Sequence, residues 1–147
     1  MSSQTPHAGR ADTLHAQVQH FAHEHAAEVE VVVTSFDGRL VSLGGALGTE
    51  TAERFAATAY GIAVTARWAN HELGRRGVDT IVARFHDAVW VVSPVHGAGW
   101  LAVCADKKQD TGQLSYRAAR FADRIHPLLP EQSELLELPS PLSGAVK

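Results

Sequence analysis

The chain has 147 residues, 45% of them hydrophobic and 20% charged, a composition typical of one folded globular domain. Its formal net charge is −3, and the only basic cluster, Arg75-Arg76, is followed at once by a glycine, so no basic stripe for nucleic acid is predicted. A single cysteine excludes an intrachain disulfide framework, residues 1–10 have no signal-peptide apolar stretch, and no apolar run reaches the roughly 18 residues that span a bilayer. We therefore expect a cytoplasmic protein that neither binds nucleic acid nor inserts directly into a membrane.

The chain begins with a polar segment that leads into a predicted helix. Residues 1–11 mix Ser, Gln, Pro, Gly and His without an apolar period, so we expect them to be disordered. Asp12 or Thr13 can cap a helix, after which apolar residues recur at helical spacing, at Leu14, Val18, Phe21 and Ala22. This spacing predicts a first helix with one buried stripe.

A β-hairpin is predicted next. Residues 29–36 are mostly β-branched, Asp37-Gly38 supplies a turn, and residues 39–43 resume an extended pattern. Three successive valines, Val31, Val32 and Val33, place apolar groups on both faces of the first strand. We therefore expect this strand to lie in the interior of a sheet.

A long, alanine-rich second helix is predicted from Thr49 to about Arg76, with Gly77 as its terminator. It carries more apolar surface than a helix lying on a sheet needs. Because small side chains let two helix backbones approach closely, we predict that it pairs with a second copy of the chain. The alternative is that alanine is abundant here only because it is the best helix former. The residues predicted at the dimer contact are Ala56, Ala59, Tyr60 and Ala63.

The second half of the chain predicts a three-stranded meander, at residues 80–85, 88–93 and 100–105, and a third helix over 112–129. Residues 130–147 contain three prolines and are expected to be a disordered tail, although Leu135, Leu136 and Leu138 could dock on the body. The order helix, hairpin, helix, meander, helix predicts an α+β fold, with an antiparallel sheet of about five strands flanked by helices, in one domain over residues 12–129.

Candidate chemical groups are few. His20, His23 and Glu24 are close on the first helix, but their spacing fits no zinc motif, so a solvated face is the favoured interpretation. The glycine-rich loop 44–48 precedes a helix, yet lacks the lysine of a phosphate-binding loop. Cys104 lies in an apolar strand, where a free thiol usually acts as a small core hydrophobe. We therefore predict no catalytic residues, no metal site and no cofactor.

Three segments in order carry a resemblance to a known family. They are V-V-V-T-S-F-D-G-R-L-V at 31–41, the alanine-rich helix at 53–68, and W-L-A-V-C-A-D at 100–106 with T-G-Q-L-S-Y-R beyond it. Over residues 14–129 the chain resembles the roadblock family, which includes dynein-associated light chains, bacterial gliding-motility proteins and actinobacterial conservon proteins.

The resemblance implies a profilin-like sheet, a homodimer formed through the second helix and an edge strand, and a small Ras-like GTPase or motor component as partner. Actinobacterial members occur beside sensor kinases, which are a further candidate partner. We therefore predict a non-catalytic homodimeric regulator or scaffold, and as the alternative a small-molecule-sensing domain of the same fold. Because arginine and tryptophan are enriched at binding hot spots, Arg54, Arg67 and Trp68 are the predicted partner-binding residues, although they do not all share one helix face.

Overall fold

A computed structural model describes residues 6–24, 29–75 and 77–130 of the chain. Its elements, in chain order, are α1 (Pro6–His23), β1 (Glu30–Ser35), β2 (Leu40–Gly44), α2 (Thr49–Glu72), β3 (Ile81–Arg84), β4 (Ala88–Val95), β5 (Gly99–Asp106), α3 (Thr111–Ile125) and the short 3-10 helix η1 (His126–Leu128). None of the described helices is long and apolar enough to cross a membrane.

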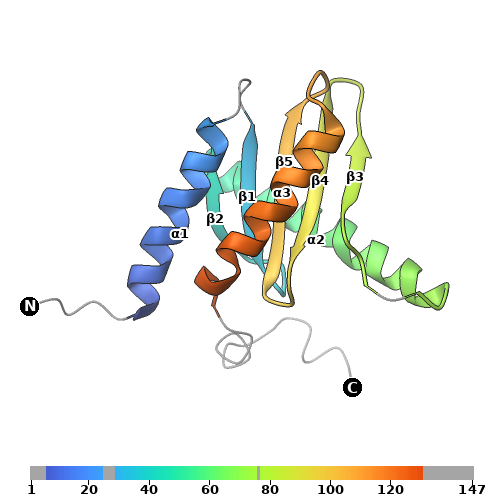
Figure 1. Cartoon of the computed structure of the whole chain (residues 1–147), viewed down its shortest axis with the longest axis horizontal. Coiled ribbons are helices and arrows are strands. Elements are labelled where there is room, and N and C mark those ends of the chain that lie inside the picture. Colours follow the sequence, from blue (N-terminus) through green and yellow to red (C-terminus); the bar gives the residue numbers. More distant parts are fainter. Residues whose placement is uncertain (1–5, 25–28, 76, 131–147) are drawn as a thin grey trace, which may run out of the picture.

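The five strands form one antiparallel sheet in the order β2-β1-β5-β4-β3. Helices α1 and α3 lie on one face of this sheet and α2 lies behind it on the other (Figure 1). The predicted α+β fold, the element order, the hairpin and the meander are therefore confirmed. Within the hairpin and the meander, each strand pairs with the next one in the chain. The pairing of β1 with β5 is the one that joins distant parts of the chain.

Strand β1 lies inside the sheet, as its valines predicted. Val31 and Val33 pack towards α1 and α3, whereas Val32 packs towards α2. All three side chains are fully buried. A strand with helices on both faces has no polar side to present, which explains why its sequence does not alternate.

The two faces of the sheet have cores of different character. Beneath α1 and α3 the core is aliphatic and aromatic, with Phe21 stacked on Phe121 at 4.4 Å between ring centroids. Beneath α2 the helix contributes mostly alanines, which pack on Val32, Trp100 and Ala102. The small side chains allow the backbone of α2 to lie close to the strands, since interaxial distance depends on the side chains at the contact.

Two helix boundaries differ from the prediction. Helix α1 begins at Pro6, six residues before the predicted start at Asp12; proline is tolerated in the first turn of a helix, and two alanines follow it. Residues 1–5, like the tail 131–147, lie outside the described residues. Helix α3 ends at Ile125 rather than Leu129, because Pro127 has no N–H for the next helical bond.

Helix α2 ends at Glu72, four residues earlier than predicted. Gly74 has φ +71°, its N–H donates to the carbonyl of His71, and the N–H of Arg75 donates to the carbonyl of Asn70. These two bonds form a Schellman motif, which satisfies the last carbonyls of the helix. The first available glycine therefore ends the helix, and Gly77 lies beyond it. At the other end the cap is Gly48 rather than Thr49.

Candidate interaction surface

The side of α2 turned away from the sheet is unusually apolar for a surface. Ala57, Gly61, Val64 and Trp68 are exposed and follow one another at spacings of four, three and four residues, which places them on one helix face. Trp68 is 65% exposed, and Leu73, directly after the helix, is 76% exposed. Exposed apolar groups gathered on one face indicate an interaction site more often than isolated ones do. We refer to Ala57, Gly61, Val64 and Trp68 as the outer face of α2.

The alanines predicted at the dimer contact lie on the opposite side of this helix. Ala56, Ala59 and Ala63 are fully buried and pack on the chain's own sheet. Tyr60 is half-buried, and a Cβ added at Gly38 in the β1–β2 turn would lie only 2.7 Å from its ring. These four side chains therefore serve packing within the chain. The pairing of α2 with a second copy of the chain stays a prediction, and the outer face of α2 is the surface through which it would occur.

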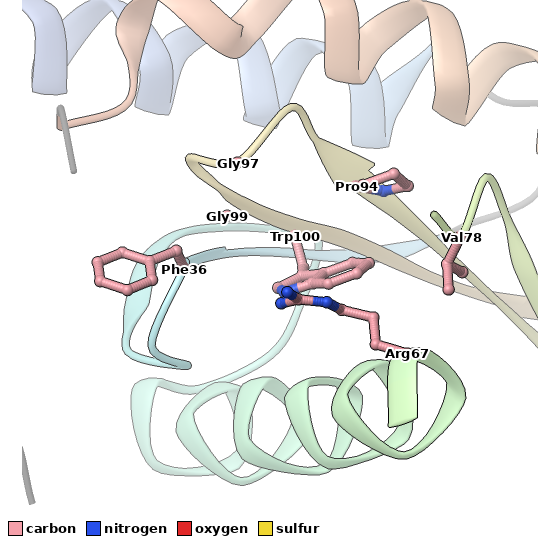
Figure 2. Close-up of a pocket in the computed structure, with 7 residues that line it drawn as sticks. All are labelled: Phe36, Arg67, Val78, Pro94, Gly97, Gly99 and Trp100. Atoms are coloured by element: carbon pink, nitrogen blue, oxygen red, sulfur yellow. The ribbon is translucent and has the colours of Figure 1, made fainter. Parts of the chain in front are cut away.

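A cleft of about 340 Å³ lies beside α2, at the end of the sheet where β4 turns into β5. It is lined by Phe36, Arg67, Val78, Pro94, Gly97, Gly99 and Trp100. Figure 2 shows Arg67 extending from α2 towards the Trp100 ring, with Phe36 on one side and Val78 and Pro94 on the other. The indole of Trp100 is almost fully buried at the back of the cleft, whereas the Arg67 side chain is exposed.

The three predicted partner-binding residues do not form a single site. All three are exposed, but Trp68 belongs to the outer face of α2, Arg67 points into the cleft, and Arg54 lies in the N-terminal half of the helix. Arg54 forms an ion pair with Glu50 one turn away, in which both side chains are largely exposed. Such an exposed pair contributes little to stability, so Arg54 can exchange it for another carboxylate at low cost.

The edge strand β3 is paired on one side with β4. On the α2 side of this edge, Phe85 is half-exposed and its ring lies 5.4 Å from that of Trp90, which in turn lies 4.5 Å from Phe55. Apolar surface therefore continues from α2 to the edge of the sheet. Sequence reasoning missed Phe85 because a lone aromatic residue before a turn has no distinguishing signal.

The histidines of the first helix and the glycine-rich loop are the other groups singled out in the sequence. His20 pairs with Glu24 at 3.4 Å on an exposed face, and no cluster of three potential metal ligands occurs among the described residues. In the glycine-rich loop, the N–H of Ala46 donates to the carboxylate of Glu30 at 2.9 Å. An acidic group thus already occupies the position that an anion such as phosphate would take in this loop.

Cys104 has the environment of an unreactive thiol. It is half-buried on β5, and desolvation by burial raises its pKa, against a smaller opposing effect of a hydrogen bond with Trp90. His96, a histidine that could activate a thiol, lies in the β4–β5 turn at the other end of β5 and pairs with Asp123 at 2.7 Å. The thiolate, which is the nucleophile, is therefore disfavoured near neutral pH.

We expect Cys104 to react slowly with iodoacetamide in the native protein. Because its pKa is raised, the alkylation rate at neutral pH should fall below that of the same chain unfolded in urea, and it should increase as pH rises towards the raised pKa. Mass spectrometry of samples quenched over time measures both rates. Equal alkylation rates in the folded and unfolded chains would contradict the interpretation of Cys104 as an unreactive thiol.

Comparisons with solved structures identify the fold. No model of a known protein family matches the sequence, and no curated protein matches it. Among solved structures, a Roadblock/LC7 domain from Streptomyces avermitilis has 25% identity and a TM-score of 0.67, with 79% of this chain and 94% of that one covered. The gliding protein MglB from Thermus thermophilus has 14% identity and a TM-score of 0.67, over 86% of this chain and 93% of that one.

A further structure, of MglB with a tetrameric arrangement, has 14% identity and a TM-score of 0.68, over 86% of this chain and 92% of that one. In each of these pairs the match covers most of both chains. The chain has the Roadblock/LC7 fold, and the resemblance to the roadblock family predicted from its sequence is confirmed.

Proposed function

We propose that this protein is a non-catalytic homodimeric regulator or scaffold that binds a small Ras-like GTPase in the cytoplasm. The observation that carries the proposal is the outer face of α2. The sheet is already covered on both faces by the chain's own helices, so exposed Val64 and Trp68 have no packing role within the chain. Their exposure is explained if another protein covers them.

The first partner in this proposal is a second copy of the chain. Ala57 and Gly61 are small and exposed on consecutive turns of α2, so two such helices can approach closely there, while Val64 and Trp68 supply apolar area beside the contact. The related MglB structure with a tetrameric arrangement supports self-association as a use of this fold. Apolar Phe85 at the edge of the sheet would extend the contact to β3.

The second partner in this proposal is the GTPase, which the family resemblance supports. Pairing of the two α2 helices would bring two copies of Arg67 and of Arg54 to one composite surface. Arginine is favoured at protein contacts because its planar guanidinium binds carboxylates in a bidentate manner and stacks on aromatic rings. A sensor kinase is a further candidate for this surface.

The cleft favours a second candidate function, a small-molecule sensor. Its volume of about 340 Å³ falls in the range of small-ligand sites, roughly 300–1,000 Å³. An anionic ligand with a flat ring could pair with Arg67 and lie along Trp100. This alternative predicts a metabolite, rather than a protein, bound at the end of α2.

Affinity purification from the native cell extract, followed by mass spectrometry, distinguishes the two functions. We expect a small GTPase to be recovered with the wild-type chain, and Arg67→Ala to reduce its recovery several-fold because a charged contact is lost. Arg84→Ala, which removes an exposed arginine on the other face of the sheet, is the matched control. Recovery of a metabolite without a GTPase would contradict the proposal and favour the sensor.

A further inference from the structure

Helix α3 carries a stripe of arginines that the proposed function does not use. Arg117, Arg120 and Arg124 follow one another at spacings of three and four residues, and all are exposed. The guanidinium of Arg120 lies over the Tyr116 ring at 5.7 Å and that of Arg124 over Phe121 at 5.7 Å. Within residues 6–24, 29–75 and 77–130, none of the three forms an ion pair with a carboxylate. They make a basic surface on a chain whose net charge is −3.

This stripe forms one wall of a groove between α1 and α3. The two helices lie side by side on the same face of the sheet (Figure 1). Two hollows follow the groove, of about 340 and 440 Å³, and Arg124 lines both of them. Phe21 and Phe121, stacked on each other, line the first hollow but are almost fully buried, and Glu24 lines the same hollow. Asp12 and the exposed side chain of Ala16 line the second hollow. The three arginines outnumber the carboxylates of Glu24 and Asp12, so the groove is positive overall and suits an acidic segment that also carries aliphatic side chains.

Such a segment occurs in the chain itself, directly after the described residues. Between positions 131 and 138 the sequence E-Q-S-E-L-L-E-L contains three glutamates and three leucines and no basic residue. It follows Leu129 and Pro130, which line a hollow beside His126 at the end of α3. The negative charge of this segment therefore complements the arginines of the groove, and its leucines can contact the apolar part of the groove.

The segment is also long enough to reach the arginines. Twelve residues separate Arg117 from Leu129, which is about 18 Å at the rise of an α-helix. Glu137 is seven residues beyond Pro130, and seven extended residues span about 23 Å. A chain that turns back after Pro130 can therefore place Glu134 and Glu137 along the stripe.

We infer that the groove between α1 and α3 binds the chain's own segment 131–147, with its glutamates against Arg117, Arg120 and Arg124 and its leucines towards the apolar part of the groove. Each exposed ion pair contributes little by itself. The attachment, however, gives the segment an effective concentration in the millimolar range, so even a weak contact is populated. This contact lies across the sheet from α2 and is independent of the proposed dimer and its partner.

Paramagnetic NMR on the full chain tests this inference. A spin label is attached at Ser140→Cys in a Cys104→Ser background, and amide signals are compared with the label oxidised and reduced. We expect broadening of the signals from Arg117 to Arg124 and none on the outer face of α2. Glu134→Lys combined with Glu137→Lys should abolish the broadening, as should high salt, since exposed ion pairs are screened.

Two further variants complete the test. Arg120→Glu should reduce the broadening, and adding Glu137→Arg to it should restore part of the signal. Arg54→Glu, a charge reversal on the opposite face of the sheet, should leave it unchanged. Broadening that is absent, uniform over all faces or insensitive to charge reversal would overturn the inference. Broadening in a mixture of isotope-labelled chains and separately spin-labelled chains would also overturn it, because the segment would then belong to another copy.

Discussion

Replacing Gly61 with arginine is expected to convert the proposed dimer into a monomer while the fold is retained. Gly61 is exposed in the middle of the outer face of α2, and a Cβ added there meets no atom of the chain within 4 Å. The substitution should even stabilise the helix by about 0.5–1 kcal/mol, because glycine is a poor helix former. In the proposed dimer it buries an unpaired charge, which costs about 3–5 kcal/mol, or roughly a 100-fold or greater loss of affinity.

Light scattering after gel filtration measures the change, and circular dichroism verifies the fold. The matched control is Ala119→Arg, an equally exposed substitution on α3, which should remain dimeric. A wild-type chain that is monomeric at tens of micromolar would refute the dimer. If the Gly61→Arg variant is still a dimer, the dimer contact does not lie on the outer face of α2.

Replacing Gly99 with alanine is expected to destabilise the fold more than any other single methyl addition described here. A Cβ at Gly99 would lie 1.9 Å from the carbonyl oxygen of Thr34 and 3.0 Å from a methyl carbon of Leu129. The carbonyl belongs to the neighbouring strand β1, so it cannot move away without disturbing the pairing of β1 with β5. Overpacking of this kind costs about 3 kcal/mol, or a fall of roughly 10 °C in Tm for a domain of this size.

Thermal melting followed by circular dichroism checks this value. Gly61→Ala adds the same methyl group where there is open space, in a helix, and should raise Tm slightly instead. A Gly99→Ala variant that melts with the wild type would mean that β1 and β5 are farther apart than described.

The elements that the sequence predicted correctly are those with local signals. The hairpin has β-branched residues on both sides of Asp37-Gly38. The successive valines of β1 indicate by themselves that both faces of this strand are buried. Helix ends were less predictable. Gly74 and Gly77 both have positive φ, and only the hydrogen bonds after Glu72 show which of them ends α2.

The orientation of α2 could not be predicted because alanines occur on both of its sides. Ala56 and Ala63 face the sheet, whereas Ala57 faces away from it, and periodicity alone does not distinguish the two. As a consequence, Ala63→Asp would bury a charge within the chain and would report on folding rather than on association.

The cleft could not be predicted for a different reason. Phe36 follows β1, Arg67 lies on α2 and Trp100 lies on β5, so three distant segments meet there only after folding. No spacing in the sequence relates them. The arginines of α3, in contrast, lie on one helix and can be found by their spacing once the helix is recognised.

The central position of β1 has a consequence for how the chain acquires its structure. Glu30 pairs with Cys104 and Ser35 with Gly99, so the middle of the sheet joins segments separated by β2, α2, β3 and β4. Pairing between distant segments slows folding, because a large loop must close before the contact is formed. During synthesis, the β1–β2 hairpin emerges from the ribosome long before β5. Its inner edge and its valines then remain uncovered until most of the domain has been made, and in that interval the nascent chain is most exposed to aggregation.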